Sequence, residues 1–155
     1  MLKYCMKKDV ISIAKTATIL EAASLVASQH IGILPVVNEQ KVLVGIVSLN
    51  NLLSLEMPAF INLINDLDFM GDFGAVETTR PHYADVSRPI TEIMQPPHAV
   101  SEDDGLLYAY ALMVKNNISD LPVVSASGKL VGIVSKVDIA TEILAGWKDI
   151  KEESE

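Results

Sequence analysis

The sequence is poor in cysteine and in aromatic residues. Cys5 is the only cysteine among 155 residues, so no intrachain disulfide forms and we expect a reducing, cytoplasmic location. Aromatic residues make up 5% of the chain, whereas hydrophobic residues as a whole make up 50%. This balance excludes a chain that is disordered throughout and predicts a folded protein with an aliphatic core.

Positive charge is also scarce. The formal net charge is −8, and the longest basic run is the pair Lys7-Lys8. Nucleic-acid binding requires clustered Lys and Arg that neutralise phosphates and release counterions. We therefore expect no nucleic-acid partner, whereas a small anionic ligand stays open because a pocket needs only local donors.

Long apolar runs are missing as well. No uninterrupted run approaches the roughly 18 residues that span a bilayer, so we expect no membrane association. The opening residues MLKYCMKK lack the apolar stretch and the small-residue cleavage site of a signal peptide. We expect no secretory leader.

What the sequence does contain is an internal repeat. Leu34–Val37, five residues, then Leu43–Ser48 recurs identically as Leu121–Val124, five residues, then Leu130–Ser135. The offset is 121 − 34 = 87 in the first stretch and 130 − 43 = 87 in the second. Identities at one fixed spacing predict two copies of one small structural unit.

Each copy has the pattern of a β-α-β-β-α unit. Val10–Ile13 alternates in polarity, which predicts a short strand. Thr18-x-x-Glu21 is a capping box that opens a helix. Two apolar, β-branched runs joined by a short turn predict a hairpin, and in the second copy Gly128 suits a positive-φ turn position. A second helix follows each hairpin, and the copies are small enough that we expect them to pack together.

The copies are separated by a long connection. We assign residues 1–55 to the first copy, 56–92 to a linker with a helix, 93–147 to the second copy and 148–155 to an acidic tail. In the linker Phe60, Leu63, Ile64 and Leu67 lie at helical spacing. This predicts a helix that closes over the core of the repeat. The alternative is a dimer or partner contact formed by Phe60, Leu63, Leu67, Phe69 and Phe73. The stretch 80–89 has the composition of a loop.

These motifs resemble a known family. The Met6–Ile13 opening, the Glu-Ala-Ala helix, the Leu-Pro-Val-Val strand and Gly-Ile-Val-Ser before a helix resemble a cystathionine-β-synthase (CBS) domain. The resemblance covers residues 6–55 and 93–145, and two copies in tandem resemble a CBS pair, or Bateman module, of the stand-alone prokaryotic type. It implies an α+β fold: two tandem β-α-β-β-α units, packed as a pseudo-two-fold pair with small mixed sheets and flanking helices.

The resemblance also implies a function. Similar proteins bind adenosine-type ligands in clefts between the copies, at a Gly-hydrophobic-hydrophobic-Ser/Thr-x-x-Asp motif, and signal to an effector protein, which is unknown here. In the second copy this motif is Gly132 to Asp138. The hydroxyl of Ser135 and the helix N-terminus would face a phosphate or ribose, and Asp138 would accept hydrogen bonds from ribose hydroxyls. The first copy has Ser48 with a neutral Asn51, which predicts a weaker site.

One departure from the family pattern bears on the ligand. Many nucleotide-binding relatives carry a basic residue two positions before the conserved proline, where this chain has Ile33 and Asp120. Asp120 would repel a polyphosphate, which favours AMP, ADP, S-adenosylmethionine or methylthioadenosine over ATP, with no cofactor required. The ligand-binding residues that the resemblance implies are Ile11, Ile33, Pro35, Ser48, Asn51, His98, Asp120, Leu121, Pro122, Gly132, Ser135 and Asp138.

Two alternatives stay open. Ser-x-x-Asp at a helix start is also the pattern of an ordinary N-cap with an acidic residue in the first turn. In that case the chain is a ligand-free dimerisation or scaffold module. Either way we expect a homodimer, because helices rich in small residues pack well against copies of themselves; these residues are Ala22, Ala23, Ala27, Ala109 and Ala111.

Catalytic and metal-binding patterns are weak. His30, His82 and His98 show no metal-ligand spacing with Cys5. No local nucleophile–base arrangement and no Gly-rich phosphate loop occur. We therefore expect no metal and no enzymatic activity.

Overall fold

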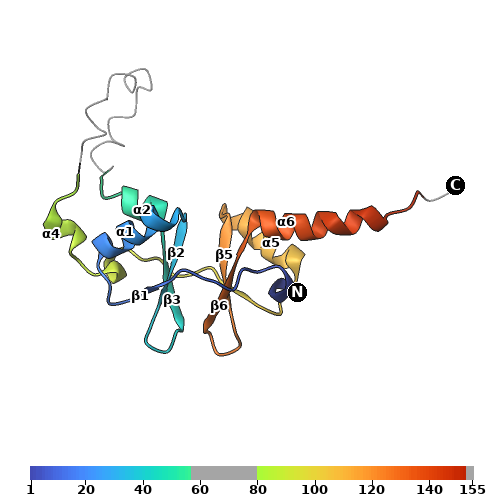
Figure 1. The fold of residues 1–155 in the computed structure, drawn as a ribbon, viewed down its shortest axis with the longest axis horizontal. Helices are drawn as coiled ribbons and strands as arrows, with labels where there is room; N and C mark the ends of the chain where they lie inside the picture. Colours follow the sequence, from blue (N-terminus) through green and yellow to red (C-terminus); the bar gives the residue numbers. More distant parts are fainter. Residues whose placement is uncertain (57–79, 153–155) are drawn as a thin grey trace, which may run out of the picture. The chain divides into compact units, whose positions relative to one another are not determined.

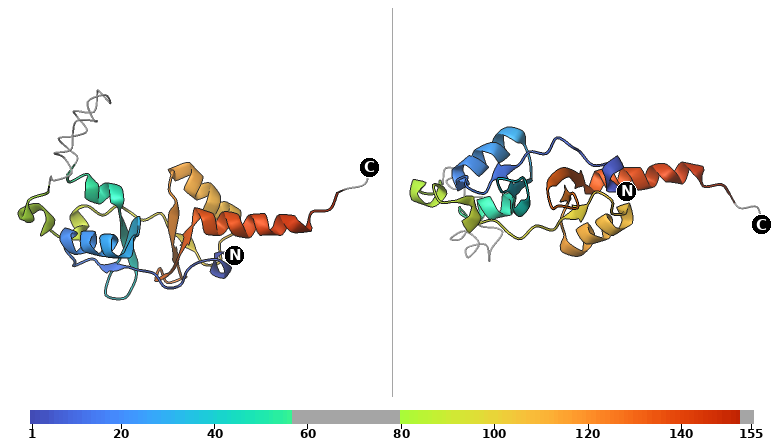
Figure 2. Two further views of the ribbon diagram at one scale, coloured as in Figure 1. Left: turned by 45° about the horizontal axis from the view of Figure 1, so that its top comes forward. Right: turned by 90° about the horizontal axis from the view of Figure 1, so that it is seen from below.

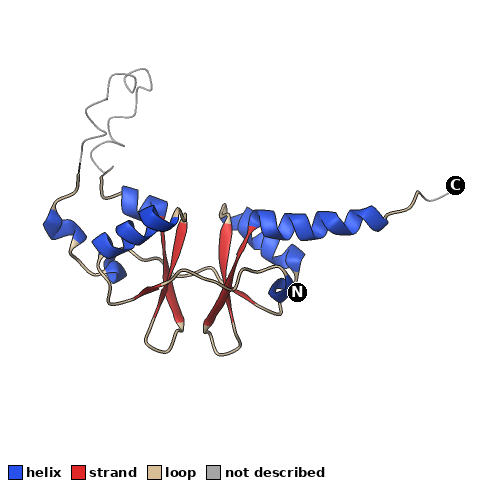
Figure 3. Ribbon diagram, in the orientation of Figure 1, coloured by secondary structure: helices blue, strands red, loops and turns tan. Residues whose placement is uncertain are grey.

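The computed structural model describes residues 1–56 and 80–152, which form two compact units (Figures 1 and 3). Unit 1 consists of the described residues within Met1–Ser12, Val37–Val44 and Pro97–Glu155. Unit 2 consists of the described residues within Ile13–Val36 and Gly45–Pro96. Each unit therefore combines stretches that are far apart in the sequence.

The first copy of the repeat forms a three-stranded sheet in the order β1-β2-β3. Its strands are β1 (Ile13–Ala14), β2 (Ile33–Val37) and β3 (Leu43–Ser48). Helix α1 (Ile19–Gln29) connects β1 to β2, and α2 (Leu49–Leu53) follows β3. The apolar, β-branched runs thus form the expected hairpin, and β2 is buried along almost its whole length.

Helix α1 begins at the predicted capping box. The backbone N–H of Glu21 donates to Thr18 Oγ1 at 3.2 Å, and the backbone N–H of Thr18 donates to a Glu21 carboxylate oxygen at 3.0 Å. These two bonds satisfy backbone donors that a helix start otherwise leaves unpaired. The helix ends at His30, which adopts the left-handed conformation with φ of 53°.

The second copy repeats this arrangement in unit 1. Strand β4 (Val100–Ser101) runs parallel to β5 (Asp120–Val124), and β5 pairs antiparallel with β6 (Leu130–Ser135). The turn between β5 and β6 has Gly128 at φ of +80°, as its glycine predicts.

Two helices cover one side of this second sheet. Helices α5 (Leu106–Asn116) and α6 (Lys136–Ala145) pack against each other on the same side of it, as both views in Figure 2 show. Short 3₁₀ segments η1 (Leu2–Tyr4) and η5 (Gly146–Asp149) lie near the chain ends. The β-α-β-β-α order and the mixed three-stranded sheets predicted from the sequence are confirmed.

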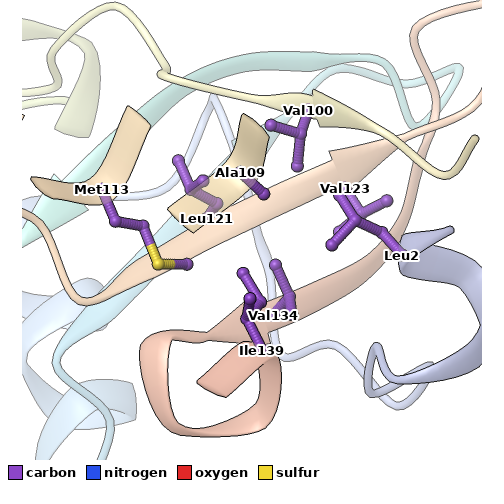
Figure 4. Close-up of a cluster of buried hydrophobic side chains, with 8 residues drawn as sticks. All are labelled: Leu2, Val100, Ala109, Met113, Leu121, Val123, Val134 and Ile139. Carbon is purple, nitrogen blue, oxygen red and sulfur yellow. The ribbon is translucent and has the colours of Figure 1, made fainter. Parts of the chain in front are cut away.

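The core of unit 1 is aliphatic. Each element of the second copy contributes to it, and η1 adds Leu2, which is fully buried. Burial of such side chains stabilises the fold by about 25 cal/mol per Å² of apolar surface. Figure 4 shows the cluster: Leu2, Val100, Ala109, Met113, Leu121, Val123, Val134 and Ile139.

A short backbone pairing fixes the N-terminal segment in unit 1. The N–H of Lys7 donates to the carbonyl of Ile133, and the N–H of Ile133 donates to the carbonyl of Lys7, both at 2.9 Å. Unit 2 contains the same pairing between Gln95 and Ile46, again with two bonds of 2.9 Å. Each strand that follows a hairpin turn therefore gains an edge partner from the segment that precedes the other copy.

Two glycines allow this close approach. A Cβ on Gly132 would lie 2.6 Å from Met6 Sδ and 3.0 Å from the carbonyl oxygen of Lys7. In unit 2 a Cβ on Gly45 would lie 2.6 Å from Met94 Sδ. Close packing against the preceding segment thus favours glycine at this position of each Gly-Ile-Val-Ser motif.

Three expectations from the sequence need correction. The first strand is Ile13–Ala14 rather than Val10–Ile13, because the N–H of Val10 turns back to the carbonyl of Lys8 at 3.0 Å. The stretch 80–89 is not a plain loop, since it contains the short helix α4 (Tyr83–Val86), followed by η4 (Ile90–Glu92). The predicted linker helix and the alternative aromatic contact surface lie outside the described residues.

The third correction concerns the small-residue helices. Ala22 and Ala109 are fully buried, because helical spacing places them on the sides of α1 and α5 that face the cores. They cannot contribute to a dimer surface. Ala27 and Ala111 are exposed and Ala23 is half-buried.

Gly132→Ala should destabilise the protein by about 1–3 kcal/mol, because the new methyl group overpacks against the backbone of Lys7, which is held by its bonds to Ile133. Gly146→Ala is the matched control, since Gly146 has φ of −68° and nothing within 4 Å of a Cβ. Urea unfolding of both variants checks this. An unchanged midpoint for Gly132→Ala would contradict the role assigned to the glycine.

Candidate functional site

The Ser-x-x-Asp motif of the second copy lies at the N-terminus of α6. The backbone N–H of Asp138 donates to Ser135 Oγ at 3.0 Å, and the N–H of Ser135 donates to Asp138 Oδ2 at 3.0 Å. The motif is therefore a complete capping box. A carboxylate has about four lone-pair sites on two oxygens, so this one bond leaves Asp138 with capacity to accept more hydrogen bonds.

Asp120 lies next to this helix start. It is the first residue of β5 and pairs with Ser135 of β6 in the sheet register. Its carboxylate is half-buried, and that burial raises its pKa above the ordinary value. The negative charge of Asp138 raises this pKa further, so the two carboxylates interact.

Lys7 opposes the negative charge of Asp120. The N-terminal segment holds it against the other edge of β6, and its ammonium group lowers the pKa of Asp120. Sequence reasoning missed Lys7 as a site residue. The only signal was the alignment of Met6 with Met94, which places Lys7 and Gln95 at equivalent positions.

The remaining predicted residues of unit 1 are less directly placed for ligand contact. Leu121 is fully buried in the core cluster, and Pro122 is buried in β5. The space beside Gly132 is filled by Met6 and Lys7. Ile11 is half-buried and His98 is exposed, and both lie outside the strands and helices.

The equivalent positions in unit 2 have the same geometry without the charges. The N–H of Asn51 donates to Ser48 Oγ at 3.3 Å, and the N–H of Ser48 donates to Asn51 Oδ1 at 2.8 Å, which is again a capping box. Ile33 begins β2, and Pro35 is buried within it. Asparagine thus replaces the aspartate as a cap, but it carries no charge.

Unit 2 also contains an apolar groove between α1 and α2, with a volume of about 500 Å³. The sequence analysis did not predict it as a site, although Ala23 and Ala27, two of the small residues it singled out, lie on its wall. Leu49 and Leu53 are 43% and 51% exposed there. The lining residues are Ala23, Val26, Ala27, His30, Ile31, Gly32, Leu49, Leu52 and Leu53.

Among residues 1–56 and 80–152, no three His, Cys, Asp or Glu side chains are grouped as a metal site. No helix in these ranges is long and apolar enough to cross a membrane. Burial raises the pKa of the Cys5 thiol, and the charges of Glu142 and Asp138 raise it further, which keeps the thiol protonated at neutral pH.

Comparison with known proteins identifies the repeat. A family model described as "CBS domain" matches residues 2–57 and 85–145. An uncharacterized protein of Methanocaldococcus jannaschii, MJ1426, is 43% identical over 61 residues, which cover 39% of this chain and 36% of that protein. The chloroplastic CBS domain-containing protein CBSX1 of Arabidopsis thaliana is 28% identical over 152 residues. That match covers 92% of this chain and 63% of CBSX1, so the chain spans less than two thirds of either relative.

A similar solved structure is that of the CBS domain pair of protein MJ0100 in complex with 5′-methylthioadenosine and S-adenosyl-L-methionine. Its TM-score is 0.67 and its sequence identity is 25%, with 94% of this chain and 97% of that chain covered. The tandem repeat and the α+β fold are thus shared over almost the whole of both chains.

Asp120→Asn should raise the free energy of unfolding, relative to that of the parent protein, more at pH 7 than at pH 3. An acid whose pKa is raised by folding contributes stability at low pH and loses it as the pH rises through its folded pKa, which for Asp120 burial raises above the ordinary value of an aspartate. Removing the ionisable group removes that loss, so the variant gains on the parent as the pH rises. Urea unfolding between pH 3 and pH 7 measures this.

Asp149→Asn is the control, because Asp149 is exposed on η5 and its replacement should change stability little at either pH. An Asp120→Asn variant less stable than the parent by the same amount at both pH values would contradict the desolvated carboxylate.

Proposed function

Because the chain belongs to the CBS domain family, we propose that it is a regulatory module that binds an adenosine-type ligand at the start of α6. The observation that supports this most directly is the capping box of Ser135 and Asp138, which fixes a carboxylate at the N-terminus of a ten-residue helix. The MJ0100 pair, which has the same fold at 25% identity, is in complex with two adenosine derivatives.

The chemistry of a nucleoside fits these groups. Asp138 accepts hydrogen bonds from the ribose 2′- and 3′-hydroxyls with the oxygen capacity that the cap leaves unused. The N-terminus of α6 favours an electron-rich group of the ligand. Asp120 adds a half-buried negative charge, which disfavours a triphosphate and favours AMP or an S-adenosyl compound over ATP.

The two copies are proposed to differ in affinity. Unit 2 has the same cap with Asn51 in place of the aspartate, and its helix α2 is only five residues long. A neutral amide contributes less to a diol than a carboxylate does. The stronger site is therefore the one in unit 1.

As a regulator, the protein would act through a partner. A ligand that binds one conformation more tightly shifts the population towards it, and an effector protein reads the shift. The single cysteine is compatible with a cytoplasmic setting for such a protein. The alternative is a scaffold module without a ligand, in which the capping boxes serve only to start their helices.

We further propose a homodimer that uses the α1–α2 groove of unit 2. Its lining is apolar, and half-exposed leucines lie along one side of it. A second copy of the chain would bury this surface, since closed two-fold assemblies place the same patch on both partners. Both the ligand-binding and the scaffold hypotheses are compatible with such a dimer.

Asp138→Asn should weaken binding of S-adenosylmethionine, methylthioadenosine and AMP by about tenfold, because a charge-assisted hydrogen bond contributes roughly 1.5–3 kcal/mol and a neutral one about 1. The variant copies the natural arrangement of Ser48 and Asn51, so it retains the cap and should retain its stability. Titration calorimetry measures the affinity, and urea unfolding measures the stability.

Asn51→Ala is the control for ligand binding and should change the dominant affinity little. Asp138→Ala should lose both binding and about 1 kcal/mol of stability with its cap. If Asp138→Asn and Asp138→Ala bind these compounds as well as the parent does, the motif is only a helix cap and the scaffold function replaces the proposal.

Leu49→Glu should shift a dimer to monomer at micromolar concentration, because it places a charge in the groove wall. Ser28→Glu is the control, since Ser28 is exposed on the same helix as Ala27 but does not line the groove. Light scattering after size-exclusion chromatography gives the masses. A monomeric parent, or a dimeric Leu49→Glu variant, would contradict this assembly.

A further inference from the structure

The site in unit 1 differs from its equivalent in unit 2 by charge at three positions. The repeat offset of 87 relates Asp120 to Ile33 and Asp138 to Asn51, and the upstream offset of 88 relates Lys7 to Gln95. All three residues of unit 1 are charged, and all three equivalents in unit 2 are neutral. The backbone pairings of Lys7 and Gln95 are nevertheless the same, so at this pair of positions the difference lies in the side chains.

The sheet register places these charged groups on one face. Residues directly opposite each other in antiparallel pairs point to the same side of a sheet. Lys7 is opposite Ile133, and Asp120 is opposite Ser135, two residues further along β6. Lys7 and Asp120 therefore lie on the same face of the sheet as Ile133 and Ser135. Val134 points to the other face, into the core.

The sheet register also sets the distance between the backbones of Lys7 and Asp120. Lys7 and Asp120 lie on opposite edges of β6, so their Cα atoms are separated by two strand spacings and two residues of rise, which is ~12 Å. Lys7 is exposed and forms no salt bridge with any residue that the structure describes. Asp120 likewise has no salt-bridge partner in those ranges. The charge of Lys7 nevertheless lowers the pKa of Asp120, so the two groups interact electrostatically.

We propose that Lys7 and Asp120 together recognise a zwitterionic tail, so that unit 1 selects an adenosine derivative whose 5′ substituent ends in an α-amino acid. The ammonium of Lys7 binds the carboxylate of that tail, and Asp120 binds its amino group. Asp138 holds the ribose. This inference rests on the proposed function, and it adds a specificity-determining residue that belongs to the segment before the first copy rather than to the second copy itself.

The equivalent residues of unit 2 predict a different preference. Gln95, Ile33 and Asn51 offer neither a cation for a carboxylate nor an anion for an ammonium group. A ligand with an uncharged tail therefore forgoes no charge-assisted hydrogen bond in unit 2. The two sites of one chain are thus built for adenosine derivatives of different charge.

The test compares S-adenosylhomocysteine, which has an amino-acid tail and a neutral sulfur, with methylthioadenosine, which has a neutral tail. Titration calorimetry on the full chain at about 0.15 M salt should show S-adenosylhomocysteine binding about tenfold more tightly, the scale of one charge-assisted contact. Lys7→Gln, which copies Gln95, should reduce this preference to threefold or less and leave methylthioadenosine binding unchanged.

Three variants separate recognition from structure. Lys7→Arg should restore the preference, because it restores the cation. Lys8→Gln removes the same charge one residue away and should leave the preference intact. Asp120→Asn should reduce it as Lys7→Gln does. The urea midpoint of Lys7→Gln should match that of the parent, since Lys7 is held by backbone bonds that glutamine also makes.

The possible failures are distinguishable. Equal affinity of the parent for both compounds, or an equal effect of Lys7→Gln and Lys8→Gln, would overturn the zwitterion site and leave the adenosine-binding function standing. Absence of binding for both compounds and for AMP would overturn the proposed function, and this inference with it.

Discussion

The structure depends on two reciprocal backbone pairings, Lys7 with Ile133 and Gln95 with Ile46. Each pairing consists of two hydrogen bonds of 2.9 Å, and a glycine one residue before the paired isoleucine lets the two backbones approach closely. A side chain at Gly132 or Gly45 would displace the segment that pairs there. The segment preceding each copy is thereby built into the unit formed by the other copy, and neither compact unit is a contiguous stretch of chain.

Because of this exchange, each compact unit gains stabilising contacts from a segment that precedes the other copy. A unit of about fifty residues buries little of its surface and is marginally stable alone. In unit 1 the N-terminal segment adds Leu2 to the core, and two further backbone bonds fix it, from Leu2 to Asp104 at 3.0 Å and from Lys3 to Glu102 at 2.9 Å. The stability of the second copy therefore depends on residues that precede the first copy. These contacts join segments far apart in the sequence, so forming them carries an entropic cost of loop closure.

The sequence predicted the local structure well because local chemistry determines it. The capping boxes, the hairpins and the positive φ of Gly128 all follow from residues within a few positions of one another. The exchanged segments were not predictable in the same way, since a single bridge such as that of Lys7 leaves no periodic pattern. For the same reason Lys7 is missing from the predicted site, and the Gly-Ile-Val-Ser pattern alone does not indicate that Gly132 packs against Met6. Burial of Ala22 and Ala109 was missed because small size alone does not tell a helix's core-facing side from its exposed side.

A helix cap and a ligand contact at Asp138 are compatible rather than competing roles. The cap occupies Oδ2 and fixes the rotamer, so that the carboxylate has little conformational freedom left to lose when another group binds it. A side chain that is already ordered is thus a better ligand contact than a free one. Asn51 makes the same cap in unit 2, and it shows that the cap alone does not require a charge. The charge of Asp138 has two opposing effects in the folded state, because the N-terminus of α6 favours a carboxylate while the nearby carboxylate of Asp120 disfavours it.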